Sequence, residues 1–195
     1  MQIDIKKAAA RISGQVLQTP LFYSKYLSAL NKGQVYLKLE NEQYTGSFKA
    51  RGALNKILGL SSSEKAKGLI TASTGNHAQG FARALEIANA EGTIFLPTTA
   101  EASKVEALKA YKVGLQFHGA DALTTELHAM KFAEASGQIW ISPYNDPEVI
   151  AGQGTLALEM TSQLDSIDAV LGCIGGGGMM SGVATWLHQA SPKTK

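Results

Sequence analysis

Lys49 lies just inside the predicted start of a helix, within residues 44–52. Thr45 or Ser47 could cap the first amides of this helix, and Gly46 would allow a tight turn before it. Most lysines in a first helical turn are solvated, but the apolar neighbours predict a half-buried helix that opens onto a cleft: Phe48, Ala53, Leu54, Ile57 and Leu58. Burial lowers the pKa of a lysine and leaves a free amine that attacks carbonyl carbons, so Lys49 is a candidate for a Schiff base.

Four consecutive glycines, Gly175, Gly176, Gly177 and Gly178, follow the apolar residues 168–174 and open another predicted helix. Glycines let the backbone approach an anion closely, and a helix start offers unpaired amides and the positive end of the dipole. The alternative is a flexible turn, but four glycines would cost conformational entropy there without a structural gain. We predict a phosphate-binding loop. A nucleotide is the weaker candidate, because no lysine follows the glycines as in a P-loop.

A second polar loop, residues 71–80, also joins a predicted strand to the start of a helix. Its candidate substrate-binding residues are consecutive: Ser73, Thr74, Gly75, Asn76 and His77. Hydroxyls and unpaired amides at a helix start suit a carboxylate, and Asn76 could donate to a phenolate-like oxygen. His77 suggests a general base, but a lone histidine in a first helical turn is more often a structural hydrogen-bonding group, which is the role we prefer.

The lysine, the glycine run and the asparagine loop together describe a site for a phosphorylated aldehyde. Pyridoxal phosphate fits this description, because its aldehyde would take Lys49, its phosphate would take the glycines and its ring acts as an electron sink. The sequence contains no spaced cluster of His and Cys residues that predicts a metal site.

Alternating strands and helices must position these loops. Predicted strands cover residues 34–40, 68–72, 92–96, 114–118, 138–142 and 168–174, and further predicted helices cover residues 4–14, 76–90, 100–111, 121–136 (capped by Asp121), 147–164 and 178–189. This alternation predicts an α/β protein with a parallel sheet flanked by helices, and ligands that bind beyond the carboxyl ends of the strands. We expect two lobes: a discontinuous large, cofactor-binding lobe of residues 1–67 and 147–195, and a small lobe of residues 68–146 that carries the substrate loop.

The composition is that of a globular protein, with 195 residues of which 45% are hydrophobic and 17% charged. The net charge of +2 is spread evenly, so nucleic acid is not an expected partner. The N-terminus lacks a secretion signal, and no apolar run approaches the roughly 18 residues that a membrane span needs, so we expect a soluble, cytoplasmic protein. The single cysteine, Cys173, fits a reducing compartment and is predicted to be buried.

Four motifs resemble the serine/threonine dehydratase and serine racemase group of the tryptophan-synthase-β-like, fold type II pyridoxal phosphate enzymes. They are residues 47–53, residues 73–80, residues 152–155 and the run from Gly175 to Gly178, in the family's order. The resemblance implies that each lobe has a mostly parallel sheet flanked by helices. It also implies that Lys49 binds the cofactor aldehyde and takes the substrate's α-proton. The implied cofactor-binding set is Phe48, Lys49, Asn76, Gly175, Gly176, Gly177, Gly178 and the amide of Met179.

The reaction that this resemblance implies is dehydration and deamination of a small β-hydroxy amino acid, L-threonine or L-serine, to a 2-oxo acid and ammonia. Thr74 departs from the pattern, because relatives that racemise serine carry a serine hydroxyl there as a second base, and many dehydratases carry alanine. Threonine keeps the hydroxyl but adds a methyl group, so we prefer dehydration and keep a racemase, with Thr74 as a catalytic residue, as the alternative. Serine, threonine and hydroxyaspartate all stay open as substrates. We expect a homo-oligomer, a dimer.

Family members continue well past the last predicted helix. We therefore expect a chain truncated within the large lobe, without the residue that meets the pyridine nitrogen and without the acidic ligands of a divalent cation. Apolar surface and an open strand edge should then be exposed. A catalytically incomplete chain that acts only by association is the remaining alternative.

Overall fold

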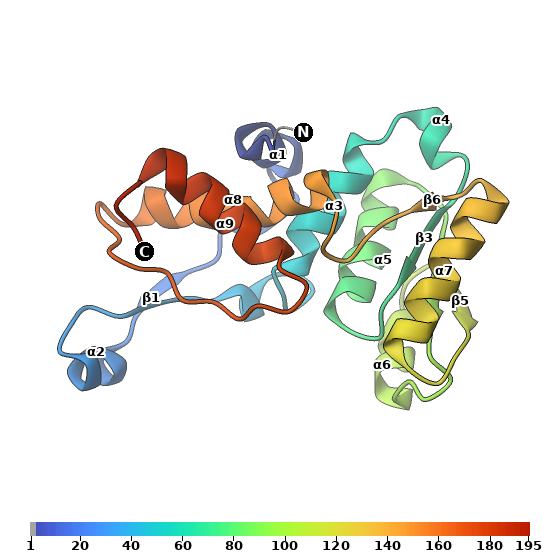
Figure 1. Ribbon diagram of the computed structural model, residues 1–195, viewed down its shortest axis with the longest axis horizontal. Coiled ribbons are helices and arrows are strands. Elements are labelled where there is room, and N and C mark those ends of the chain that lie inside the picture. Colours follow the sequence, from blue (N-terminus) through green and yellow to red (C-terminus); the bar gives the residue numbers. More distant parts are fainter. Residues whose placement is uncertain (1–2) are drawn as a thin grey trace.

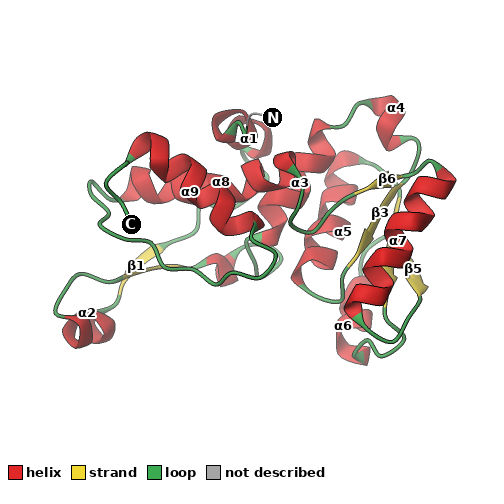
Figure 2. Ribbon diagram, in the orientation of Figure 1, coloured by secondary structure: helices red, strands yellow, loops and turns green. Residues whose placement is uncertain are grey.

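A four-stranded parallel sheet forms one half of the molecule in the computed structural model, which describes residues 3–195 (Figures 1 and 2). Its strands are β3 (Leu69–Ala72), β4 (Gly92–Leu96), β5 (Gly114–Phe117) and β6 (Ile139–Trp140), in the order β5-β4-β3-β6. All three neighbouring pairs run parallel. The predicted α/β class and the four corresponding strands are confirmed, with β6 shorter than predicted. Residues 1 and 2, where the predicted large lobe begins, lie outside the described residues.

Helices cover both faces of this sheet. On one face lie α5 (Asn76–Ala88) and α6 (Ala102–Lys109), and on the other lies α7 (Ala122–Ser136). Alternate residues of one strand serve the two faces: Leu69 of β3 packs in a buried cluster with Phe81 of α5, and Ile70 packs with Ala129 of α7. This follows from the two-residue period of a strand, whose successive side chains point to opposite faces.

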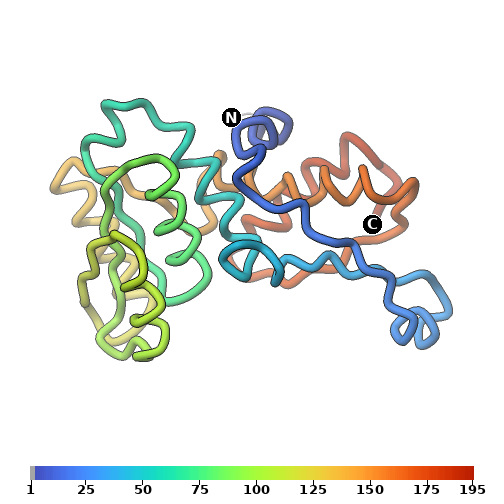
Figure 3. Tube along the Cα trace, turned by 180° about the vertical axis from the view of Figure 1, so that it is seen from behind, coloured from blue at the N-terminus to red at the C-terminus, as the bar shows by residue number. Residues whose placement is uncertain are grey.

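The other half of the molecule is mostly helical. It contains α1 (Ile5–Ile12), β1 (Leu21–Tyr23), α2 (Lys25–Asn31), β2 (Tyr36–Lys38), the 3-10 helix η1 (Glu40–Glu42), α3 (Lys49–Gly59), α8 (Pro147–Gln163) and α9 (Gly178–Ala190), and the short α4 (Ser62–Lys65) leads from α3 to the sheet. Strands β1 and β2 pair antiparallel, and with α2 they project from the end of the molecule opposite the parallel sheet (Figures 1 and 3). Of the helices in residues 3–195, none has the length and apolar character needed to cross a membrane.

Glycines of residues 152–155 allow two helices to approach the backbone of α8. A Cβ atom added to Gly152 would lie 2.7 Å from the Cα atom of Gly52 in α3, and one added to Gly154 would lie 2.9 Å from the carbonyl oxygen of Gly182 in α9. Side chains at these positions would force the helices apart. This motif therefore brings α3, which begins with Lys49, and α9, which follows the glycine run, against the same helix.

The predicted buried strand at residues 168–174 is wrong. These residues form no strand, and Leu171 and Ile174 are 93% and 74% exposed. Cys173 is also exposed, contrary to its predicted burial. A parallel strand needs a neighbour to receive its backbone hydrogen bonds, and the described part of the chain places no strand beside this segment. The predicted strand at residues 34–40 is likewise reduced to β2, because Glu40 begins η1.

Candidate active site

A pocket of about 280 Å³ lies beyond the carboxyl ends of the parallel strands. It collects five of the residues singled out in the sequence: Lys49, Ser73, Thr74, Asn76 and His77. Pro97 and Pro143, which follow the carboxyl ends of β4 and β6, also line this pocket. A larger hollow of about 970 Å³ at the opposite ends of the strands contains no predicted site residue. The parallel topology therefore places the polar loop of residues 71–80 where ligands of α/β proteins bind.

Lys49 is the first residue of α3, and its side chain is half-buried in this pocket. Its amide donates to the Ser47 hydroxyl at 3.1 Å, but the N-cap position is Phe48, so neither Thr45 nor Ser47 is the predicted side-chain cap. Gly46 has the positive φ of 67° that the predicted turn requires. The Lys49 ammonium donates to the carbonyl oxygen of Pro143 at 2.6 Å. Burial lowers the pKa of Lys49, and the charge of Glu126 offsets part of that decrease.

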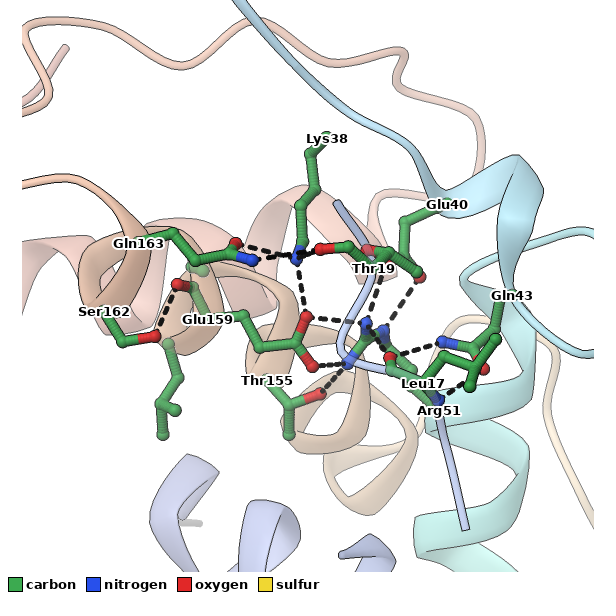
Figure 4. A network of polar contacts seen from close by, with 12 residues as sticks. Leu17, Thr19, Lys38, Glu40, Gln43, Arg51, Thr155, Glu159, Ser162 and Gln163 are labelled. Atoms are coloured by element: carbon green, nitrogen blue, oxygen red, sulfur yellow. Dashed lines mark hydrogen bonds and ion pairs between the residues drawn. The ribbon is translucent and has the colours of Figure 1, made fainter. Parts of the chain in front are cut away.

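Helix α5 fixes the backbone of Lys49 from the other side. A Cβ atom added to Gly80 would lie 3.0 Å from the carbonyl carbon of Lys49. Two residues after Lys49, the fully buried Arg51 donates to Glu40 of η1 at 2.8 Å and to Glu159 of α8 at 2.6 Å (Figure 4). Lys38 also donates to Glu159, at 2.6 Å. The first turn of α3 is therefore held by close packing and by a network of buried charges.

His77 is only 2% exposed, and its Nε2 atom lies 3.0 Å from the hydroxyl of Thr71. That hydroxyl donates its one proton to the carbonyl oxygen of Ile141 at 2.8 Å, so the network assigns the imidazole hydrogen to Nε2 and leaves Nδ1 as an acceptor. Burial, with the nearby charge of Lys49, lowers the pKa of His77 to about 3. The imidazole is neutral and makes a structural hydrogen bond, as preferred from the sequence.

The pKa of His77 predicts a stability change with pH. Between pH 6.5 and about 3 the unfolded chain binds a proton at His77 that the folded chain does not, so stability should decrease as the pH falls through this range. We expect the loss from pH 7 to pH 5 to be smaller by about 2 kcal/mol in His77→Gln than in the unmodified chain. Urea unfolding at both pH values measures this difference. His188→Gln, at an exposed imidazole, is the control, and an equal loss in both variants would contradict the assignment.

The glycine run lies next to the pocket but does not line it. Gly177 has a φ of 82° and precedes Gly178, the first residue of α9. A Cβ atom added to Gly176 would collide with the ring of Tyr144, which does line the pocket. Nothing lies within 4 Å of a Cβ atom added to Gly175 or Gly177. Space is therefore open beside Gly175 and Gly177, whereas Tyr144 packs on Gly176 and Gly178.

Three other predicted residues also lie outside the pocket lining. Phe48 packs against the cluster between α8 and α9, with its ring centroid 5.6 Å from the Lys49 ammonium. Met179 packs against the same cluster. Gly75 precedes α5, where an added Cβ atom would meet nothing within 4 Å. A nucleophilic amine with a lowered pKa and an open glycine turn at a helix start are nevertheless donors that fit a phosphorylated aldehyde.

Sequence reasoning missed two pocket residues, Glu126 and Tyr144. The Tyr144 hydroxyl donates to Glu126 at 3.0 Å, and this bond, together with burial, raises the pKa of Tyr144. The position of Tyr144, two residues after the predicted strand at residues 138–142, is a signal that points to the ligand side of a parallel sheet. Glu126 carried no such signal, because it lies in the middle of a predicted helix.

A family model described as pyridoxal-phosphate dependent enzyme matches residues 12–195. The catabolic L-threonine dehydratase of Staphylococcus aureus (strain N315) is 44% identical over 190 residues, which cover 97% of this chain and 55% of the relative. The chain therefore spans about half the length of the curated relatives that it matches.

Solved structures give the same picture. A pyridoxal 5'-phosphate-dependent aspartate racemase is 38% identical with a TM-score of 0.92, over 98% of this chain and 60% of that chain. The processed form of threonine deaminase isoform 2 from Solanum lycopersicum is 38% identical with a TM-score of 0.91, over 98% and 54%. Serine racemase from Dictyostelium discoideum is 34% identical with a TM-score of 0.92, over 98% and 62%.

Proposed function

The chain belongs to the pyridoxal-phosphate dependent enzyme family, and from this premise we propose that it acts as an ammonia-lyase that dehydrates and deaminates L-threonine or L-serine to a 2-oxo acid and ammonia. The observation that carries the proposal is the half-buried Lys49 amine, in one pocket with the hydroxyl and amide side chains of residues 73–77. The 44% identity to a threonine dehydratase supports this reaction over others of the family.

Pyridoxal phosphate, when bound, supplies an electron sink for the breaking of bonds at the amino acid's Cα atom. In this proposal Lys49 holds its aldehyde, and the amides from Gly175 to Met179 hold its phosphate at the positive end of α9. Asn76 donates to its phenolic oxygen, and Phe48, beside Lys49, supplies an apolar face for its ring. The Tyr144 ring packs on Gly176. It would have to move to leave room for the pyridine ring of the cofactor between Lys49 and the glycines.

The Lys49 amine is also the base of this proposal. Its lowered pKa increases the fraction of free amine near neutral pH, and a free amine accepts the proton from the substrate's Cα atom. Amides at the start of α5, with Ser73 and Thr74, bind the substrate carboxylate. His77 contributes its backbone amide to this set, because its Nδ1 atom is an acceptor and would repel a carboxylate.

We also propose the division into a large lobe, residues 1–67 and 147–195, and a small lobe, residues 68–146. The confinement of the parallel sheet to residues 69–140 supports this division. In this arrangement Lys49 and the glycine run come from one lobe and residues 73–77 from the other.

A serine-racemase-type isomerase is the second candidate. The Thr74 side chain lines the pocket that contains Lys49, where its hydroxyl would serve as the second base. Association without catalysis is the third, and the exposed Leu171 and Ile174 favour it. Self-association into the proposed dimer would appear in sedimentation of the purified chain.

The reaction is tested by incubating the cofactor-loaded chain with L-threonine and with L-serine and assaying the 2-oxo acid. A dehydratase should release 2-oxobutyrate from L-threonine and pyruvate from L-serine. The Thr74→Ala variant should retain this release within about 10-fold, because in a dehydratase the Thr74 hydroxyl is not the proton acceptor. A racemase should instead form the D-amino acid without 2-oxo acid, and Thr74→Ala should abolish it. Absence of both products would contradict both catalytic proposals.

A further inference from the structure

Among residues 3–195, Glu126 is the single acidic side chain that lines the pocket. Its Oε1 atom accepts the hydrogen bond from Tyr144, and no described residue donates to its Oε2 atom. The single hydroxyl proton of the neighbouring Thr125 is shared between the carbonyl oxygens of His118 and Asp121, both at 2.7 Å, so this hydroxyl has no proton to donate to a ligand. One carboxylate oxygen of Glu126 is therefore left for a hydrogen-bond donor in the pocket.

Among the described lining residues, only the Lys49 ammonium can offset the charge of Glu126. The His77 imidazole is neutral. The described residues provide no arginine in this lining that could pair with a second substrate carboxylate. If pyridoxal phosphate held the Lys49 amine, Glu126 would be the dominant charge among the described lining side chains.

We propose that Glu126 is a specificity-determining residue, which favours amino acids with a β-hydroxyl group and disfavours those with a second carboxylate. This inference rests on the proposed function and narrows it to serine and threonine over hydroxyaspartate. A serine or threonine hydroxyl can donate its proton to Oε2 of Glu126. A second carboxylate has no proton to donate near neutral pH and meets the like charge of Glu126.

The test compares L-serine with L-aspartate as probes of the chain loaded with pyridoxal phosphate. Affinities are taken from the initial change in visible absorption on mixing, before turnover. The unmodified chain should bind L-serine more tightly, and Glu126→Gln, which keeps an acceptor for Tyr144 but lacks the charge, should reduce this preference about 10-fold or more. Glu134→Gln, on the same helix but outside this pocket, should leave the preference unchanged.

A second measurement needs no cofactor and no activity. Because the bond to Glu126 raises the pKa of Tyr144, the Tyr144 phenol should titrate at lower pH in Glu126→Gln, measured by alkaline ultraviolet absorbance against Tyr144→Phe. If Glu126→Gln lowers the pKa of Tyr144 but leaves the preference for L-serine over L-aspartate unchanged, the specificity role of Glu126 is wrong and the proposed function still stands. If the pKa of Tyr144 is the same in Glu126→Gln as in the unmodified chain, the contact between Glu126 and Tyr144, from which the role is argued, is wrong. If L-serine does not alter the spectrum of the loaded, unmodified chain, the proposed function fails and this inference fails with it.

Discussion

The Lys49→Ala variant is expected to lose the visible absorption band that the purified chain develops with pyridoxal phosphate, and to reduce 2-oxo acid release at least about 100-fold. Of the residues that the structure describes, Lys49 is the only one that lines the pocket with an amine, and burial lowers its pKa. A methyl group can neither attack the cofactor aldehyde nor accept a proton from the substrate. The measurement is a titration with pyridoxal phosphate followed by absorption, and then addition of L-threonine with 2-oxo acid detection.

Two further variants separate chemistry from folding. Lys49→Arg keeps the positive charge beside the Pro143 carbonyl but is not a nucleophile at neutral pH, so it should also lack the band. Lys67→Ala, at an exposed lysine in the larger hollow at the other ends of the strands, should keep it. A band that persists in Lys49→Ala would show that another amine binds the cofactor. If the unmodified chain develops no band, the proposal that these 195 residues catalyse the reaction is wrong.

Replacement of Arg51 by methionine is expected to lower the free energy of unfolding by about 3–5 kcal/mol. The guanidinium is fully buried and donates to Glu40 and Glu159, whose side chains are 9% and 12% exposed. Lys38 would still pair with Glu159, but Glu40 would be left as a buried carboxylate without a cation. Removing one partner of a buried pair is costly for this reason, even where the intact pair adds little stability. Urea unfolding followed by circular dichroism measures the loss.

The controls for Arg51 use a surface pair and a compensating change. Lys109→Met removes the exposed pair with Glu106 and should change the free energy of unfolding by less than about 1 kcal/mol. Adding Glu40→Gln to Arg51→Met should recover part of the loss, because the amide carries no charge into the protein interior. A loss below about 1 kcal/mol for Arg51→Met alone would mean that water solvates these carboxylates.

Local features were predictable because short stretches of chain determine them. The strands β3, β4 and β5 lie within one residue of their predicted bounds, since alternation and flanking glycines mark them. Asp121 caps α7 as predicted, accepting from the Thr124 amide at 2.8 Å. The strand prediction for residues 168–174 is wrong because it depends on more than the local sequence. Its apolar pattern predicts a buried strand, but burial and pairing depend on segments elsewhere in the chain.

Residue types and short spacings were enough to predict the α/β alternation, the turn at Gly46, the two loops at helix starts and Lys49 as a candidate nucleophile. All of these follow from propensities and spacings within a few residues. The three-dimensional packing of distant segments was needed to show that Arg51 bonds to a carboxylate 108 residues away, that Glu126 and Tyr144 line the pocket, and that His77 is held neutral. Desolvation and charge pairing set these properties, and both depend on which distant segments of the chain pack together.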